Sequence, residues 1–548
     1  MGKEGGALKE TFSEISPSDF FYRNRDLAGF TNPSRALYST VRELVENSLD
    51  ACELDSIPPE IYTRITQFDP RETEDPRKYL VRIQDNGPGV SPDYVPEAFG
   101  KVLYGSKYKL RQSRGMFGLG GTMAILYGQI TSNRPVVIQT SFDGIKKYTF
   151  RLMIDIEKNK PLILEKKAED ANGKRGTIVE LVVEGDYFRS TQKIQDYFKQ
   201  TALVVPYADI TFIDPVGRIF YYLKTTGEMP PPPKETLPHP HGIDVEFMRR
   251  MIRQSKEPYL VKYMSKRFHR VGEKTAIKFL QFAGFDQNRD PKSLSDEEIV
   301  NLVTSMHKYE EFLPPDADCL SPLGANIFSA GIIKELVPEF FTIVMRPPSA
   351  YSGFPFIVEL ALIYGGKMSD KGIKLYRFAN RIPLLYDEAS DISWKVINEE
   401  IDWKRYKIPQ EAPIAVVVNI SSTRIPYKTV GKEYLADRPE LEKELKNALR
   451  ETLRKLSAYL SRRTSEEHEK RKTNLYIKYL PLIANFSREL ANKEKLPNYK
   501  RLLKGGQGEI AVEKEAEKIV EKEVAEEDNE KVEVIKGGQK KIEEFTVD

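Results

Sequence analysis

Four consecutive prolines, residues 230–233, constrain the fold of this chain more than any other feature of its sequence. Proline lacks a backbone N–H and holds φ near −65°, so such a run cannot continue a helix or a central strand. It predicts a stiff linker between two domains. The chain has 548 residues, more than one hydrophobic core normally covers, so about two to four domains are expected.

The hydrophobic pattern differs between the segments that flank this linker. Residues 31–228 alternate helical and strand-like stretches, whereas residues 229–306 contain the linker followed by short apolar stripes at helical spacing. Residues 307–472 return to a mixed pattern, in which "FPFIVELALIYGG" and "APIAVVVNI" predict buried strands. Within this part, residues 438–472 predict a long, charged amphipathic helix. The expected fold class is therefore α+β, with a small all-helical insert.

Three further segments complete the predicted organisation. Residues 1–30 are polar and are expected to form an N-terminal arm. Residues 473–504 are expected to extend the chain as helix beyond the second mixed domain. Residues 505–548 are too polar to bury much surface, so a flexible charged tail is expected there.

Charge and cysteine content limit the kind of partner and the compartment. The 84 Lys and Arg residues nearly balance the 81 Asp and Glu residues, for a net charge of +3, so any contact with nucleic acid must come from local basic patches. The two cysteines, Cys52 and Cys319, offer no disulfide framework and indicate a reducing, cytoplasmic location. The chain shows neither a signal peptide pattern nor a run of about 18 apolar residues, so no membrane partner is expected.

The first candidate site lies on a helix that is predicted to begin near residue 33. Asn32 is a suitable N-cap, and Pro33 suits the first helical position. Glu43, Asn47 and Asp50 follow at spacings of four and three residues, so they share one face of the helix. The amide oxygen of Asn47 suits Mg²⁺, and a carboxylate such as Glu43 can deprotonate an attacking water. For these three residues alone, an ordinary solvated helix face is the favoured alternative.

The second candidate site follows a β-rich segment, where "DNGPG" begins with Asp85. Gly87 and Gly89 supply backbone freedom and leave space beside a flat ligand. A carboxylate at this position can accept a hydrogen bond from the exocyclic amine of adenine. The alternative is a plain surface turn, because Asn-Gly and Pro-Gly are strong turn formers.

The third candidate site is a glycine loop, "GMFGLGG" at residues 115–121, which runs into an apolar helix. Backbone amides at a helix N-terminus bind anions, and glycines let phosphate oxygens approach them. The loop is not a Rossmann fingerprint, because no strand runs directly into it. It is not a Walker A loop either, because the Gly-Lys-Ser/Thr ending is absent.

A fourth element, Gly176-Thr177, opens a predicted strand, and its hydroxyl could bond the adenine edge or a structural water. As an isolated pair it is best explained as a strand-start turn. In this order, however, the four motifs resemble the signature of the ATP-binding superfamily shared by gyrase, the Hsp90 chaperone, sensor histidine kinases and MutL. The resemblance implies a Bergerat-fold ATPase sandwich, with ATP and Mg²⁺ as its cofactors.

Residue roles follow from this resemblance. It implies that Glu43 is the general base, that Asn47 is the Mg²⁺ ligand and that Asp85 binds the adenine amine. Residues 99–121 would form a lid over ATP, with Tyr104 among its contacts. The implied nucleotide-binding residues are Asn47, Asp85, Gly87, Gly89, Ser106, Lys107, Gly115, Met116, Phe117, Gly118, Leu119, Gly120, Gly121, Thr122, Thr177 and a lysine from the second mixed domain.

The rest of the chain resembles one family within this superfamily, the B subunits of topoisomerase VI. Residues 268–284 look like the helix–two-turns–helix insert of that family, and residues 346–366 look like its α/β transducer domain. Residues 420–437 look like the loop that carries its switch lysine. This resemblance implies that Lys432 is the catalytic lysine that reaches the γ-phosphate of ATP, with Lys428 as the alternative.

The same resemblance implies the partners of the chain. They are a separate DNA-cleaving A subunit in a heterotetramer, a second copy of the chain in an ATP-dependent dimer, and double-stranded DNA. None of the 28 tyrosines lies in a pattern typical of strand cleavage, so the chain is expected to hydrolyse ATP without cutting DNA. The basic face of the helical insert is explained equally well by DNA contact or by a spacer. For the Lys- and Arg-rich part of the helix at 438–472, contact with DNA or the cleaving partner and plain solvation remain open.

Other interpretations stay open at this point. A chaperone clamp of the Hsp90 type would share the ATP site, and a binding module could use ATP only as a conformational switch. In the tail, Gln539, Ile542 and Phe545 have the spacing of a sliding-clamp-binding peptide, but Thr546 stands where a second aromatic residue is usual. A solvated tail is therefore favoured over clamp binding.

Overall fold

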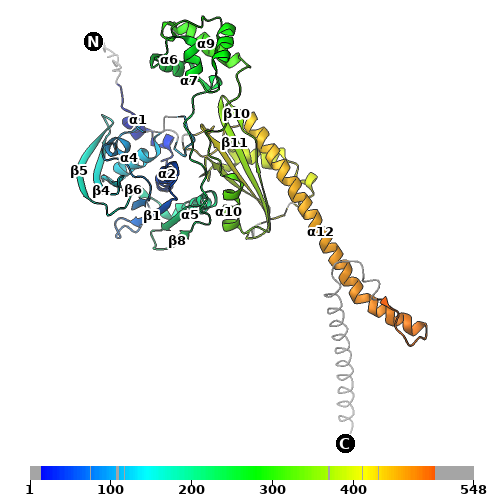
Figure 1. The fold of residues 1–548 in the computed structure, drawn as a ribbon. Helices are drawn as coiled ribbons and strands as arrows, with labels where there is room; N and C mark the ends of the chain where they lie inside the picture. Colours follow the sequence, from blue (N-terminus) through cyan, green and yellow to red (C-terminus); the bar gives the residue numbers. More distant parts are fainter. Residues whose placement is uncertain are drawn as a thin grey trace, which may run out of the picture. The chain divides into compact units, whose positions relative to one another are not determined.

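The computed structural model describes residues 14–74, 76–105, 110–115, 118–367, 371–409, 411–429 and 431–499. The chain separates into two compact units, the first ending at Leu456 and the second beginning at Ser457. Helix α12 (Pro439–Leu490) passes from the first unit into the second. The predicted α+β class is confirmed, with two sheets and a group of helices in the first unit (Figure 1).

Within the described residues, the first sheet has eight strands in the order β5-β4-β3-β6-β2-β1-β7-β8. The β1–β7 pair is parallel, and the other pairs are antiparallel. The strands are β1 (Glu60–Gln67), β2 (Arg77–Gln84), β3 (Val136–Ser141), β4 (Lys146–Asp155), β5 (Lys160–Asp170), β6 (Gly176–Gly185), β7 (Asp209–Ile213) and β8 (Ile219–Tyr222).

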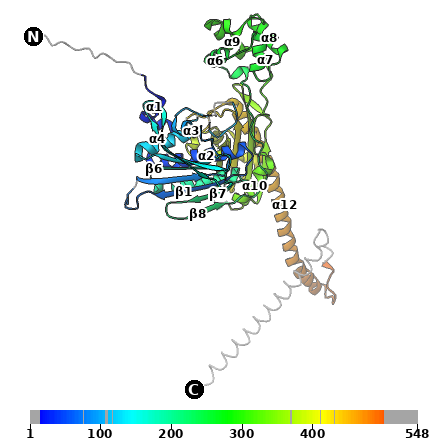
Figure 2. The ribbon, with the colours of Figure 1, turned by 60° about the vertical axis from the view of Figure 1, so that its left-hand side comes forward.

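Helices cover one face of this sheet and complete a two-layer sandwich (Figures 1 and 2). The main ones are α2 (Pro33–Leu54), α4 (Gly120–Ser132) and α5 (Tyr187–Val204). The shorter ones are α1 (Pro17–Arg23), η1 (Arg25–Ala28) and α3 (Val95–Gly100). Because α2 contacts both α4 and α5 as well as β2 and β6, its residues lie at the centre of the sandwich.

Helix α2 begins as the sequence predicts. The side chain of Asn32 accepts a hydrogen bond from the backbone N–H of Arg35, and Pro33 occupies the first helical turn. The predicted apolar stripe, which includes Leu37 and Val41, is buried against the sheet. Local capping and tertiary burial therefore favour the same helix.

The residues after the proline run form a separate helical group with its own hydrophobic core. Residues 230–233 themselves lie in neither a helix nor a strand, as expected for a linker. The helices are η2 (Pro240–Gly242), α6 (Val245–Arg253), α7 (Leu260–Arg267), α8 (Glu273–Ala283), η3 (Pro291–Ser293) and α9 (Asp296–Lys308). Buried aromatic residues such as Phe268 and Phe279 fill the core of this group.

Six strands make up the second sheet in the described part of the chain, in the order β10-β11-β14-β12-β13, with β9 also paired to β11. Both segments predicted as buried strands lie at its centre, and almost all of their residues are buried. The strands are β9 (Phe340–Met345), β10 (Ser349–Tyr351), β11 (Phe354–Tyr364), β12 (Ile373–Ala379), β13 (Ile382–Pro383) and β14 (Ile414–Ser422).

Several helices accompany the second sheet. They are α10 (Gly324–Leu336), η4 (Glu388–Ser390), α11 (Ile392–Lys395), the π-helix η5 (Val396–Glu400), η6 (Trp403–Tyr406) and α12. Helix α10 packs on α5 of the first sandwich, and a Cβ on Gly331 would lie 1.8 Å from the carbonyl oxygen of Leu203. One hydrophobic core contains residues of both sheets, such as Ile65 of β1 and Phe378 of β12. The two sheets are therefore packed together by shared apolar burial.

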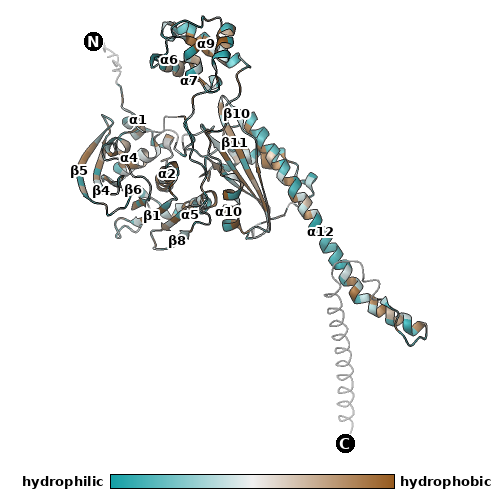
Figure 3. Ribbon diagram, in the orientation of Figure 1, coloured by the Kyte–Doolittle hydropathy of each residue, from teal (hydrophilic) through white to brown (hydrophobic). Residues whose placement is uncertain are grey.

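Helix α12 is longer than the helix predicted at 438–472 and ends at Leu490. Its leucines 441, 445, 449, 453 and 456 are all buried, as their spacing predicts. Figure 3 shows hydrophilic and hydrophobic residues alternating along the helix. No helix in the described ranges combines the length and the low charge that spanning a membrane requires.

Candidate functional site

A cavity of 640 Å³ lies between α2, α3 and the start of α4, and this size is within the usual range for a small-molecule site. It brings together residues from two of the sequence motifs and from the distant loop around residue 432. The predicted residues that line it are Glu43, Asn47, Tyr104, Gly115, Gly118, Leu119, Gly120, Gly121, Thr122 and Lys432. Asp50, from the polar face of α2, lines it as well.

The glycine loop lies directly on the polar face of α2. A Cβ on Gly120 would fall 1.7 Å from Oε2 of Glu43, and a Cβ on Gly121 would fall 3.0 Å from the side-chain amide of Asn47. Gly118 has a φ of 61°, which favours glycine. The first backbone amides of α4 therefore begin beside Glu43 and Asn47, where the helix N-terminus can bind an anion.

Glu43 is buried, with an exposed fraction of 7%, so a solvated helix face is the wrong interpretation of this motif. The ammonium of Lys432 lies 3.2 Å from both carboxylate oxygens of Glu43 and 3.1 Å from Oε2 of Glu46. Nη2 of Arg42 donates a hydrogen bond of 2.7 Å to Glu43. One carboxylate in the cavity wall is therefore held by two cations.

These contacts set the protonation of the three groups. Burial by itself would raise the pKa of Glu43, but Lys432 and then Arg42 outweigh burial and lower this pKa to about 2. Burial raises the pKa of Glu46, because burial outweighs the opposing effect of Lys432 and the charge of Glu43 adds to the rise. Burial opposes the charge of Lys432, yet Glu43 and Glu46 raise its pKa above the ordinary value. Glu43 and Lys432 thus form a buried ion pair.

The backbone explains why Lys432 reaches the cavity. Lys432 has a φ of 54°, and the carbonyl of the preceding Gly431 accepts a hydrogen bond of 3.1 Å from Nη1 of Arg42. The next residue, Glu433, forms an ion pair with Arg35 of α2. The alternative, Lys428, is half-exposed and lies 3.3 Å from Asp437 instead. The structure therefore brings Lys432, rather than Lys428, to Glu43.

Asp85 lies in a second cluster, at the end of β2. Its Oδ2 accepts a hydrogen bond of 2.8 Å from the hydroxyl of Ser48, and its Oδ1 accepts bonds of 3.0 Å from the amides of Gly87 and Thr177. Asp85 is buried, so a plain surface turn is the wrong interpretation of this motif. Burial raises the pKa of Asp85, and the three hydrogen bonds partly offset that effect.

This cluster contacts α2 but borders a different hollow. Asp85, Gly87, Gly89 and Thr177 are not among the residues that line the 640 Å³ cavity, and Asp85 lines a neighbouring hollow of 310 Å³ with Gly176. Because Ser48 follows Asn47 on α2, one turn of this helix serves both clusters. The structure thus joins the second and fourth motifs through backbone amides, whereas sequence reasoning had considered the Thr177 hydroxyl.

Two parts of the chain match families of known proteins. Residues 32–157 match the family model of the histidine kinase-, DNA gyrase B- and HSP90-like ATPases, and residues 315–472 match that of the topoisomerase VI B subunit transducer. The chain is 45% identical over 516 residues to the B subunit of type 2 DNA topoisomerase 6 from Saccharolobus solfataricus, covering 92% of this chain and 94% of the relative. The chain belongs to the topoisomerase VI B subunit family. The corresponding protein of Saccharolobus shibatae is 44% identical over 513 residues, covering 91% and 95%.

Membership of the topoisomerase VI B subunit family sets aside the Hsp90-type chaperone and the simple ATP-switched module. Four of the predicted site residues, Ser106, Lys107, Met116 and Phe117, lie outside the described residues.

Sequence reasoning missed Arg42, which contacts Glu43 and also the loop that carries Lys432. The only available signal was its position next to Glu43, because its contact with Gly431 spans 389 residues.

Proposed function

We propose that this chain uses the energy of ATP to drive DNA strand passage and supercoil relaxation together with a separate DNA-cleaving A subunit. Membership of the family establishes the ATPase subunit of a type II topoisomerase. The observation that carries the proposal is the meeting of Glu43 and Lys432 beside the glycine loop, since one comes from the ATPase sandwich and the other from beyond the second sheet. Because two domains contribute residues to the site, nucleotide binding there can change the conformation of both domains.

In this proposal ATP lies in the 640 Å³ cavity, with its phosphates against the amides of Gly118, Leu119 and Gly120. The donors present fit Mg²⁺, because Asn47 offers a neutral amide oxygen near the start of α4 and the phosphates would supply further oxygens. When bound, Mg²⁺ would neutralise charge on the phosphates. The adenine would extend from this cavity toward the neighbouring hollow that Asp85 lines, where Asp85 binds the adenine amine while Ser48 and Thr177 hold its carboxylate.

Lys432 has two competing partners in this mechanism. Paired with Lys432 and Arg42, Glu43 has a pKa of about 2 and is a weak base. A γ-phosphate attracts the same ammonium, because it carries more negative charge than one carboxylate. As Lys432 turns toward the phosphate, Glu43 loses a counter-ion and becomes more basic. ATP binding would therefore make Glu43 a stronger base for the water that attacks the γ-phosphate. Lys432 would then stabilise the charge of the transition state.

The domain division is part of the same proposal. We assign residues 31–228 to the ATPase domain, 229–306 to the helix–two-turns–helix domain and 307–472 to the transducer. Residues 1–30, whose helices α1 and η1 pack on α4 of the ATPase sandwich, would also reach a second copy in an ATP-dependent dimer, closing a gate around double-stranded DNA.

Residues 473–504 would contact the A subunit. The last turns of α12 support this assignment, because they expose several apolar residues: Leu475, Tyr476, Tyr479, Leu482, Ile483, Phe486 and Leu490. Their spacing of three or four residues makes one stripe along the helix. The charged tail, 505–548, and its sliding-clamp motif lie outside the described residues.

The test is ATP hydrolysis by the purified chain, measured with and without DNA and the A subunit. Hydrolysis should be stimulated by both. Lys432→Ala should retain nucleotide binding and lose about 10²–10³-fold in kcat, the cost of one transition-state charge donor. Lys428→Ala is the matched control and should hydrolyse ATP normally. Near-normal turnover in Lys432→Ala would reject the assigned role.

A further inference from the structure

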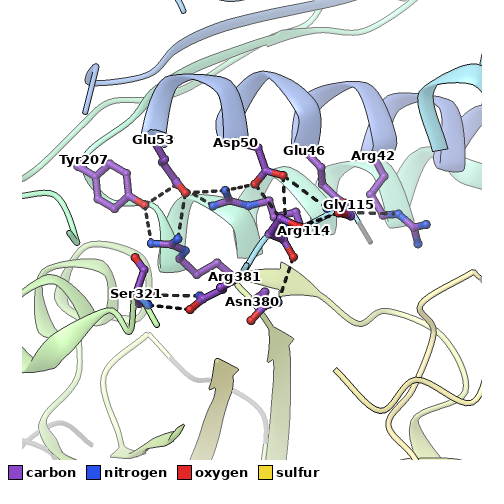
Figure 4. A network of polar contacts seen from close by, with 12 residues as sticks. Arg42, Glu46, Asp50, Glu53, Arg114, Gly115, Tyr207, Ser321, Asn380 and Arg381 are labelled. Carbon is purple, nitrogen blue, oxygen red and sulfur yellow. Dashed lines mark hydrogen bonds and ion pairs between the residues drawn. The ribbon is translucent and has the colours of Figure 1, made fainter. Parts of the chain in front are cut away.

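A second set of contacts joins the ATP cavity to the second sheet without involving Lys432 (Figure 4). We call Asp50, Glu53, Arg114 and Arg381 the buried ion cluster. Nη1 and Nη2 of Arg114 each donate a 2.7 Å hydrogen bond to Glu53, and Nη1 also lies 3.1 Å from Asp50. Nη2 of Arg381 lies 3.0 Å from the same Glu53. Tyr207, which is not a member of the cluster, donates a 2.6 Å hydrogen bond to Glu53.

The four members of this cluster come from three parts of the chain. Asp50 and Glu53 lie on α2, Arg114 lies just before the glycine loop, and Arg381 lies in the turn between β12 and β13. All four are buried, and two carboxylates balance two guanidinium groups. Arg114 strongly favours its charged form despite burial, because Glu53 and Asp50 raise its pKa. Removal of one member therefore leaves an uncompensated buried charge, so the loss of any one residue destabilises the whole cluster.

The buried ion cluster is hydrogen-bonded directly to the glycine loop. The carboxylate of Asp50 accepts hydrogen bonds from the backbone amides of Arg114, at 3.2 Å, and Gly115, at 3.4 Å. Both Asp50 and Gly115 line the 640 Å³ cavity. A shift of Arg114 would therefore displace the first residue of the loop that is proposed to hold the phosphates.

Neighbouring contacts fasten the same segment to the second sheet and to the residues just before α10. The side chain of Gln112 both donates to the carbonyl of Ser321, at 3.1 Å, and accepts from its amide, at 2.7 Å. Nδ2 of Asn380 donates hydrogen bonds of 3.0 Å to the carbonyls of Ser113 and Ser422. Gln112 and Ser113 thus each have a partner from beyond the ATPase sandwich, and Arg114 shares Glu53 with Arg381.

The turn that supplies these partners is itself held in an uncommon conformation. Asn380 and Arg381 have φ values of 48° and 66°, in the left-handed region that arginine seldom adopts. The amide of Arg381 donates a 3.2 Å hydrogen bond to Asn419 of β14, and Asn419 donates one of 2.7 Å to the buried Glu359 of β11. The position of this turn is therefore set by the central strands of the second sheet.

We propose that Arg381 is a positioning residue. Through its contact with Glu53, the position of the second sheet determines the geometry of the glycine loop, and this route is separate from Lys432. This inference rests on the proposed function, because it takes the glycine loop as the phosphate site. If Arg381 had only a structural role, it would stabilise the same contacts, but nucleotide binding would not change the conformation of the second sheet. The two differ in what the sheet does when nucleotide binds.

Hydrogen exchange measured by mass spectrometry distinguishes them. The amides of Ser321 and Ser422 report on the sheet side, because they donate to the side chains of Gln112 and Asn380. A non-hydrolysable ATP analogue should change exchange in residues 118–132 and at both reporter amides. In Arg381→Met the change in residues 118–132 should remain and the change at the reporters should vanish. The kcat for ATP should fall about tenfold, with KM nearly unchanged, as expected for lost coupling between sites.

Two further variants keep the result interpretable. Arg346→Met removes an ion pair with Glu444 that lies wholly beyond the first sheet, and it should leave the nucleotide response at the reporters intact. Gln112→Ala leaves no buried charge behind, so it should fold even if Arg381→Met does not. It breaks the bonds to Ser321 but leaves Arg381 paired with Glu53, so the response at Ser422 should persist. Loss of the response at Ser422 would mean that the coupling passes through Gln112, and this would overturn the role of Arg381.

Each outcome has a distinct meaning. If the analogue did not change hydrogen exchange in residues 118–132 of the unsubstituted protein, both the proposed function and this inference would be rejected. If those residues responded but the reporters still responded in Arg381→Met, only the coupling role would be overturned. Loss of the reporter response in Arg346→Met as well would also overturn it, because any weakening of the second sheet would then suffice.

Discussion

Replacing Lys432 with methionine should destabilise the protein by about 2–3 kcal/mol at pH 7, before any nucleotide is added. Methionine keeps most of the side-chain volume, so the change removes a charge without opening a large cavity. The pKa of Glu43 falls from 4.5 to about 2, which corresponds to about 3 kcal/mol in favour of its ionised form. The charge of Lys432 is the largest single effect that lowers this pKa. Glu46 can take up a proton in the variant, which limits the penalty.

The pH dependence has a definite sign. The pKa of Glu43 is lower in the folded than in the unfolded chain, so its contribution to stability is complete above pH 4.5 and is lost as the pH falls toward 2. The difference between the two proteins should therefore be full at pH 7 and should shrink below pH 4.5. Scanning calorimetry should show a Tm lower by about 2–3 °C at pH 7, if the first compact unit, which ends at Leu456, unfolds cooperatively.

Lys428→Met provides the matched control. Lys428 is half-exposed and pairs with Asp437, so its loss should change stability by only about 0–1 kcal/mol. An unchanged Tm in Lys432→Met at pH 7 would show that the ion pair with Glu43 carries no net stability. A loss of equal size in Lys428→Met would show that the effect belongs to the loop and not to the buried charge.

Three further substitutions test individual residues of the site. Glu43→Ala should bind ATP and lose about 10²–10⁴-fold in hydrolysis, because a missing base leaves the phosphate cradle intact; full activity would place the base elsewhere. Asp85→Ala should weaken nucleotide binding by about 2–3 kcal/mol in calorimetric titration, and unchanged affinity would contradict its role with adenine. Gly120→Ala should lower kcat/KM about a hundredfold, because its Cβ would fall 1.7 Å from Glu43, whereas Gly227→Ala, with nothing within 4 Å of its Cβ, should have no effect.

Much of the local structure could be predicted from sequence because it depends on close neighbours. The cap at Asn32 and the proline at 33 act within one helical turn, and both place the start of α2 correctly. The runs of β-branched residues in β11 and β14 select buried strands in the same way. The ordered motifs also identified the family, because each motif is contiguous in the chain.

The burial of the polar face of α2 could not be predicted in this way. Glu43 and Asp50 have the spacing of an ordinary exposed helix face, and only the packing of the glycine loop and of the second sheet removes them from solvent. The depressed pKa of Glu43 follows from that packing, since its strongest counter-ion is 389 residues away in the chain.

The sequence alone determined the α+β class, the start of α2, the two central strands of the second sheet and the family, because these depend on short-range propensity and on contiguous motifs. Tertiary structure decided which lysine meets Glu43, that Glu46 and Arg42 share its charge, and that Arg381 reaches Glu53. Such pairs depend on how two sheets pack across a shared apolar core, and apolar burial is non-directional. The exact partners of a buried charge are therefore settled only when both sheets are in place.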